Sequence, residues 1–109
     1  MDKRIVEIAD HYGYDAQSRQ LIEEMSELTG AVNKFWRKVL KCGSVEFTSD
    51  EAFRDRAAAT REMNDLIQEF ADVEVCMEQM RYMLDADEAI EAAKEDKIRR
   101  QMYRMKRGE

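Results

Sequence analysis

Proline is absent from this sequence of 109 residues, which contains only four glycines, two cysteines and one histidine. Tight turns between strands usually need Gly and Pro, so their scarcity favours long helices over a sheet. The two cysteines, Cys42 and Cys76, show no CxxC spacing, which argues against a thiolate zinc site. No apolar run is long enough to span a membrane, and no signal peptide is recognisable. We therefore expect an all-α, cytoplasmic protein that has no membrane partner and keeps both thiols reduced.

The net charge of the chain limits the kinds of partner that it is expected to bind. The chain has 24 acidic and 18 basic residues and a net charge of −6, which argues against binding to the phosphate backbone of nucleic acids. The basic residues gather near the end. Residues 94–107 contain seven of them and two acids, a net charge of +5 that leaves −11 for the rest of the chain. At this length we expect residues 1–109 to form a single domain.

Hydrophobic periodicity predicts four helical segments. They span residues 2–12, 16–40, 50–85 and 87–107, with one clear loop at residues 41–50. The stretch "RAAAT", residues 56–60, is poor in bulky side chains, so the helix could bend or pack closely there. Asp15 could cap the second helix and Asp85 the last one. The third helix has three candidate N-caps. Thr48 could form a capping box with Glu51, or either Ser49 or Asp50 could cap the helix instead.

Two of these helices carry apolar stripes at spacings of four and three residues, each beside a group of acids. The stripes are Leu21, Met25, Leu28, Val32 and Phe35 in the second helix, and Leu66, Phe70, Val73, Met77, Met80 and Leu84 in the third. With Met25 and Phe70 at heptad position a, Glu24 and Glu69 both fall at g. Helices joined by a modest loop pack antiparallel, so g positions face each other across the seam. Glu24 should then approach Glu69, with Glu27 and Asp72 beside them and Glu23 further round.

Four or five carboxylates in one place cannot all stay ionised without a counter-charge. Ligands that are all oxygen select Mg²⁺, Mn²⁺ or Ca²⁺. A di-iron bundle would need a histidine on each of two helices, whereas His11 is the only histidine and lies in neither acidic group. Because Mg²⁺ commonly holds the phosphates of a substrate, the acids suggest a site for metal-bound phosphate.

The two acidic motifs, "EEMSE" and "EFAD", resemble the EExxE…ExxD signature of the MazG-like, all-α nucleoside triphosphate pyrophosphatases. The flanking sequences "QLIEEMSELTGAVNKFWR" and "LIQEFADVEVCMEQMRYML" and the tail "KEDKIRRQ" are similar to phage-type and Firmicute-type members. The resemblance covers roughly residues 11–104. The 41 residues between Glu27 and Glu69 form a longer spacer than is usual in that family.

The resemblance implies a hydrolase that converts a nucleoside triphosphate, ribo or deoxy, into the monophosphate and pyrophosphate, in a nucleotide-pool or house-cleaning role. The implied cofactor is Mg²⁺, with Mn²⁺ as an alternative, and the implied metal ligands are Glu24, Glu27, Glu69 and Asp72. Either Glu23 or Glu24 would orient or deprotonate the attacking water. The implied substrate-binding residues are Lys97 and Arg100 of the tail. Lys34, one heptad after Glu27, could also reach the site.

Members of the family assemble as homodimers or dimers of dimers, which completes a four-helix bundle. Apolar residues without an obvious partner in one thin hairpin also favour at least a homodimer. These are Val39, Val75, Met83 and Phe53. A second class of function stays open, namely a catalytically degenerate helical module that binds a nucleotide or a protein partner only.

Overall fold

The computed structural model describes residues 1–41 and 49–109. Over this part the chain is all-α, as predicted, and contains no strand. The helices are α1 (Lys3–Tyr12), α2 (Tyr14–Trp36), α3 (Asp50–Ala58), α4 (Arg61–Met83) and α5 (Asp87–Lys106), and one π-helical turn, Arg37–Lys41, follows α2. None of these helices has both the length and the apolar character needed to cross a membrane.

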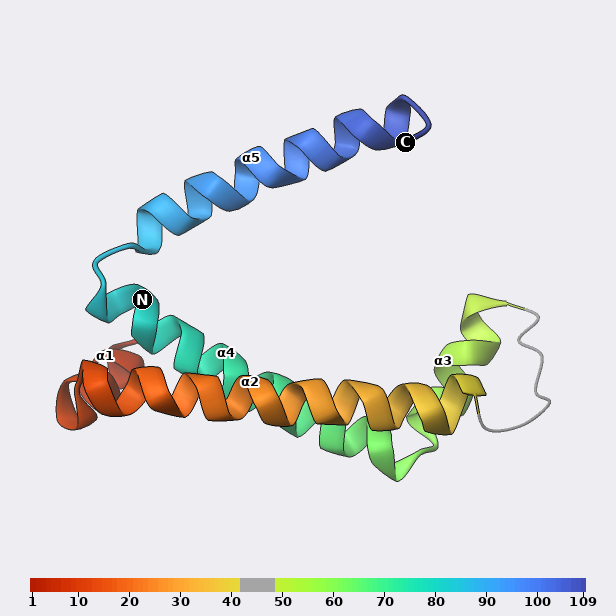
Figure 1. The fold of residues 1–109 in the computed structure, drawn as a ribbon, viewed down its shortest axis with the longest axis horizontal. Coiled ribbons are helices and arrows are strands. Elements are labelled where there is room, and N and C mark those ends of the chain that lie inside the picture. Colours follow the sequence, from red (N-terminus) through yellow and green to blue (C-terminus); the bar gives the residue numbers. More distant parts are fainter. Residues whose placement is uncertain (42–48) are drawn as a thin grey trace.

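The centre of the fold is an antiparallel pair formed by α2 and α4 (Figure 1). The short helix α1 packs mainly on α4, where the Tyr82 hydroxyl donates to Asp10 Oδ1 at 2.9 Å. Helix α3 lies at the other end of the pair, and α5 diverges from it. The radius of gyration is 17.8 Å, whereas a compact domain of this length has about 13 Å. The single chain is therefore an open arrangement of helices.

The turn between α1 and α2 depends on Gly13. Its φ of 86° lies in the left-handed region, which only glycine adopts freely, and its N–H donates to Ala9 O at 2.8 Å. This turn lets α2 begin at Tyr14, so the prediction that Asp15 caps the helix is wrong. Asp15 lies inside the first turn instead, where it pairs with Arg19 at 3.3 Å.

The single helix predicted for residues 50–85 is two helices, which are separated at Ala59 and Thr60. The Thr60 side chain accepts from Met63 N–H at 3.1 Å and donates to Ala57 O at 2.7 Å, so it ends α3 and starts α4. Of the two alternatives for "RAAAT", a bend or close packing, the structure shows a bend. Ser49 caps α3 by accepting from Ala52 N–H at 3.1 Å. Most of the predicted loop, including Thr48, lies outside the described residues.

The start of α5 also differs from the prediction. Asp85 does not cap the helix; it has a φ of 51° and turns the chain, and Ala86 precedes the first helical residue without a side-chain cap. Arg81 holds the start of α5 against α4 through ion pairs with Asp87 at 2.8 Å and Glu91. None of the residues of α5 is buried.

The predicted apolar stripes do not all lie in the seam between α2 and α4. Along α2, Leu21, Leu28 and Phe35 are half-buried, but Met25 and Val32 between them are exposed. Along α4, Val73 is buried and Leu66 and Met80 are half-buried, while Phe70, Met77 and Leu84 are exposed. A stripe with this repeat is wider than the contact between two helices, so every second member lies outside it.

Polar residues fill the remaining seam positions. Glu24 and Glu69 are half-buried. They therefore lie in the seam itself, and not beside it as their predicted heptad position g implies. At the end nearest α1, Gln17 Nε2 donates to Gln79 Oε1 at 2.7 Å, and both side chains are buried. At the opposite end, the rings of Phe35 and Phe53 pack edge to face, with 6.4 Å between their centroids.

Two of the four residues expected to lack a partner are covered within the chain. Phe53 contacts the Phe35 ring, and Val39 is only 4% exposed. The sequence could not show this, because the contact depends on α3 folding back against the end of α2. Val75 stays 40% exposed, and Met83 is half-buried.

Candidate metal and phosphate site

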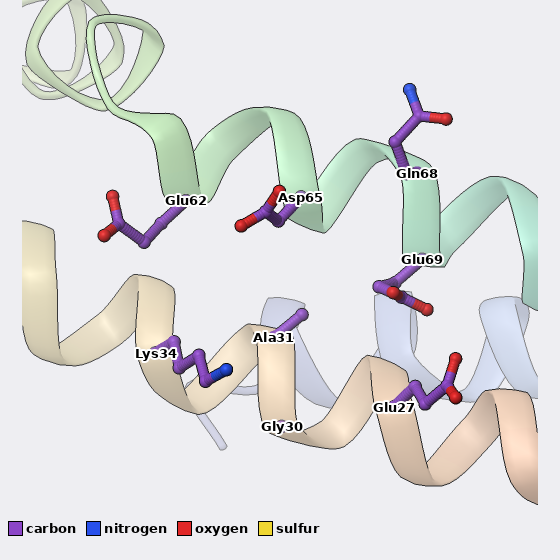
Figure 2. Close-up of a pocket in the computed structure, with 8 residues that line it drawn as sticks. All are labelled: Glu27, Gly30, Ala31, Lys34, Glu62, Asp65, Gln68 and Glu69. Carbon is purple, nitrogen blue, oxygen red and sulfur yellow. The ribbon is translucent and has the colours of Figure 1, made fainter.

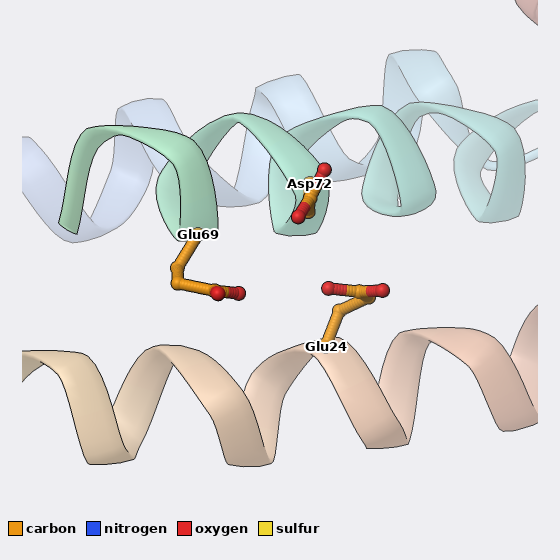
Figure 3. Close-up of side chains that lie close together, drawn as sticks. All are labelled: Glu24, Glu69 and Asp72. Carbon is orange, nitrogen blue, oxygen red and sulfur yellow. The ribbon is translucent and has the colours of Figure 1, made fainter. Parts of the chain in front are cut away.

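Three predicted metal ligands meet at the middle of the α2–α4 pair. Figure 3 shows Glu24 of α2 reaching toward Glu69 and Asp72 of α4. One carboxylate oxygen from each residue lies within 4.8 Å of the others. We call these three residues the acidic cluster. Its geometry follows from the antiparallel pairing, which brings two motifs 45 positions apart in the sequence to the same level.

The chain does not supply hydrogen-bond donors for all the carboxylate oxygens of the cluster. Glu24 Oε1 accepts from Gln20 Nε2 at 2.6 Å, but Oε2 of Glu24 and Oε2 of Glu69 are buried without a hydrogen-bond partner. The charge of Glu24 is the main cause that raises the pKa of Glu27, followed by desolvation and the charge of Glu69. Buried oxygens that lack donors require a cation or ordered water.

An apolar layer lies beside the cluster. Val73 and Cys76 are both 6% exposed and follow Asp72 on α4. Burial, and next the charges of Glu24 and Asp72, raise the pKa of the Cys76 thiol. A raised pKa favours the neutral thiol, which fits Cys76 as a packing residue in this layer.

A groove of about 350 Å³ continues from the cluster along the same side of the pair (Figure 2). Figure 2 shows Glu62, Asp65 and Glu69 of α4 pointing toward α2, while Gln68 points away. Lys34 is the one cation among its lining residues. The full lining is Glu27, Gly30, Ala31, Lys34, Glu62, Asp65, Gln68 and Glu69.

Two acids of this groove were not predicted as site residues. Glu62 and Asp65 lie one heptad before Glu69 and Asp72, so "EMND" repeats the ExxD spacing of "EFAD". Residues seven apart lie on the same side of a helix, about 10 Å apart along its axis. This repeated spacing is the feature of the sequence from which Glu62 and Asp65 could have been predicted as site residues. It extends the row of acids on α4 into the groove.

The other predicted site residues are more distant or peripheral. Glu23 is exposed and does not line the groove, although its charge contributes to the raised pKa of Glu27. Lys97 and Arg100 are exposed on α5, where Arg100 pairs with Asp96 at 3.8 Å. Neither residue lines the groove of its own chain.

Comparisons of the chain with protein-family models, curated proteins and solved structures found no match.

Proposed function

We propose that the protein is a Mg²⁺-dependent nucleoside triphosphate pyrophosphohydrolase, which converts a (d)NTP and water into a (d)NMP and pyrophosphate. The observation that carries this proposal is the pair of buried, unsatisfied carboxylate oxygens of Glu24 and Glu69, beside a groove that contains Lys34. The sequence resemblance described above adds the reaction type.

The donor set fits a hard divalent cation. Glu24, Glu69 and Asp72 offer three oxygens within 4.8 Å of one another, and Mg²⁺ and Mn²⁺ prefer carboxylate oxygen. Glu27, whose pKa is raised by this negative charge, would act as the fourth ligand. Bound Mg²⁺ would supply the positive charge that the phosphate oxygens need during hydrolysis.

The chain's own residues would divide the remaining tasks. Lys34 would bind a phosphate oxygen in the groove and so orient the triphosphate along α2. Glu23 lies on the solvent side next to Glu24 and would accept a proton from the attacking water, because Glu24 is engaged in the cluster. The water oxygen would bond to a phosphorus at the α–β bridge while the bond from that phosphorus to the bridging oxygen breaks. The monophosphate and pyrophosphate would then leave, and Glu23 would release its proton to solvent.

The direct test is release of pyrophosphate from a panel of ribo- and deoxynucleoside triphosphates, ordinary and oxidised, with Mg²⁺, with Mn²⁺ and with chelator. Metal-dependent formation of equal amounts of monophosphate and pyrophosphate is expected. Glu69→Gln should lower turnover by at least about 100-fold, since even groups that only support a ligand are worth 10- to 100-fold. Glu78→Gln, the same charge change on an exposed part of α4, is the matched control and should keep activity.

The second candidate, a helical module that binds a nucleotide without hydrolysing it, makes a different prediction. It would bind Mn²⁺ and a triphosphate in a manner that depends on Glu69, yet release no pyrophosphate. Full activity in chelator, or equal activity of Glu69→Gln and Glu78→Gln, would contradict the proposed site.

A further inference from the structure

The C-terminal half of α5 is strongly basic and fully accessible. Residues 97–107 contain six lysines and arginines and no acid, and none of the residues of α5 is buried. Figure 1 shows that α5 diverges from the α2–α4 pair, so these cations lie apart from the acidic groove. The net charge of −6, from which we expected no binding to nucleic acid, averages this segment with an acidic remainder. The net charge therefore does not describe what α5 can bind.

Four arginines and one tyrosine of this segment line a surface groove of about 330 Å³, which we call the basic groove. They are Arg99, Arg100, Tyr103, Arg104 and Arg107, and Glu109 borders the groove at its end. Positions 99, 103 and 107 lie one turn apart in one row and positions 100 and 104 in the next, so the five side chains share one side of the helix. The row from Arg99 to Arg107 is about 12 Å long, which matches about three successive phosphates of one strand.

The positive charge of the basic groove is available to a ligand. Arg104 has no ion pair among the described residues, and the other three arginines pair with carboxylates that are 53–72% exposed, at 3.1–3.8 Å. Such exposed pairs are weak, so a phosphate can replace the carboxylate and accept two hydrogen bonds from one guanidinium. The helix dipole favours Arg104 and Lys106 in the last turn, but it does not account for Arg99 and Arg100 further in.

Tyr103 gives the basic groove an aromatic surface among the arginines. The guanidinium of Arg107 lies over its ring, 5.4 Å from the centroid, and so covers one face. The side chain is 60% exposed, which leaves the other face open to a flat ligand. An aromatic ring on which a base can stack, with cations along the backbone on either side, is the usual arrangement in proteins that bind single strands.

We propose that the basic groove binds the phosphates of a single-stranded nucleic acid, with one base stacked on Tyr103. A single strand fits better than a duplex because its bases are open to the ring. The apolar residues of α5 argue against an anionic membrane surface. Ile98, Met102 and Met105 lie on another side of the helix, and the tyrosine stands among the arginines instead of in that row. A helix that lies on a membrane places its aromatic residues on the apolar side.

Fluorescence anisotropy with labelled single strands of about 16 nucleotides, in chelator, tests this proposal, which does not depend on the proposed enzymatic function. Chelator removes the Mg²⁺ that the acidic cluster would need, so strand binding reports on α5 alone. We expect saturable binding whose affinity falls with salt, with a slope of about −2 in a double-logarithmic plot, the value for three phosphate contacts. Tyr103→Ala should weaken binding about 5- to 100-fold through loss of one stacked base. Tyr12→Ala, which removes a tyrosine that is 61% exposed, is the matched control and should bind as wild type does.

Arg99→Gln tests the phosphate contacts, and it should make the salt slope shallower by about 0.7. Arg19→Gln is the matched control, because Arg19 forms the same kind of exposed pair one turn apart, with Asp15, and its slope should equal that of wild type. All of these substitutions place good helix formers at exposed positions, so helical circular dichroism should be unchanged.

Absence of saturable strand binding at low salt would overturn the proposal, and binding to phosphatidylserine vesicles alone would identify a membrane surface instead. Equal effects of Tyr103→Ala and Tyr12→Ala, or of Arg99→Gln and Arg19→Gln, would place the strand outside the basic groove. An affinity for a nucleoside monophosphate as high as that for the strand would also contradict a site built for successive phosphates.

Discussion

On one side of the α2–α4 pair most residues next to the seam are acidic or small, and on the other side most are large and apolar. Glu27 and Asp65 belong to the first side, and Met25 and Phe70 to the second. The two sides differ by only two positions along each helix, or about 200°. The first side has two buried carboxylate oxygens without a hydrogen-bond donor, and the second has large apolar side chains that are exposed. The acidic groove and the exposed apolar side chains therefore lie on separate sides of one helix pair.

The largest effect that we expect concerns polar groups inside the seam itself. The buried Gln17–Gln79 pair is satisfied by its own hydrogen bond, whereas Oε2 of Glu24 and of Glu69 has no partner. Gln79→Ala should therefore destabilise the protein by about 1–3 kcal/mol, because Gln17 is left buried and unpaired. Gln17→Leu combined with Gln79→Leu removes both polar groups and should be less destabilising than Gln79→Ala.

Urea denaturation of the single and double variants measures this difference. Similar destabilisation by both would mean that volume and not hydrogen bonding governs this end of the seam. By contrast, Glu24→Gln in chelator should leave stability unchanged or higher, since it removes negative charge from a cluster that lacks a counter-ion.

Much of this arrangement could be predicted from the sequence. The helix class, the antiparallel pairing and the approach of Glu24, Glu69 and Asp72 follow from heptad spacing, because residues three and four apart share one side of a helix. The assignment of Met25 and Phe70 to the seam was wrong for a related reason. Their stripe spans two adjacent sides, and periodicity alone does not tell which side meets the neighbouring helix.

Other features depended on local chemistry that periodicity does not contain. The start of α2 is set by the left-handed turn at Gly13, and the start of α4 by two hydrogen bonds of Thr60. Glu62 and Asp65 repeat the motif of Glu69 and Asp72, but their place in a groove depends on small residues opposite them, Gly30 and Ala31. Such contacts between helices are visible only when the register is known.

A smaller effect should separate the two lysines that the sequence analysis predicts to bind substrate. Lys34 lines the acidic groove, while Lys97 is exposed on α5. Lys34→Ala should raise KM about fivefold, the equivalent of roughly 1 kcal/mol for an exposed charged contact, with little change in melting temperature. Lys97→Ala should leave KM unchanged if each groove acts within its own chain.

Steady-state kinetics on both variants decides between these expectations. An increase in KM for Lys97→Ala that matches Lys34→Ala would mean that α5 of a second copy reaches the groove. An unchanged KM for Lys34→Ala would place the phosphates elsewhere.

The smallest expected effect is a pH dependence of stability on the acidic side. The charge of Glu24, followed by desolvation and the charge of Glu69, raises the pKa of Glu27 above its ordinary 4.5. The folded chain then holds this proton more tightly than the unfolded chain. The resulting stabilisation is fully present below pH 4.5 and is lost as the pH rises through the raised pKa.

Thermal melts of wild type and Glu27→Gln between pH 4 and 7, in chelator, isolate this contribution. Glutamine does not titrate, so the stability of wild type relative to Glu27→Gln should fall as the pH rises. The comparison also cancels the opposite trend from Asp2, whose pKa is lowered to about 2 by its bond to Arg4. Saturating Mg²⁺ should reduce the difference, because a bound cation offsets the negative charge that causes it. If the melting temperatures of the two proteins in chelator change in parallel with pH, the charge of Glu24 does not raise the pKa of Glu27. Glu27 would then be removed from the proposed ligand set.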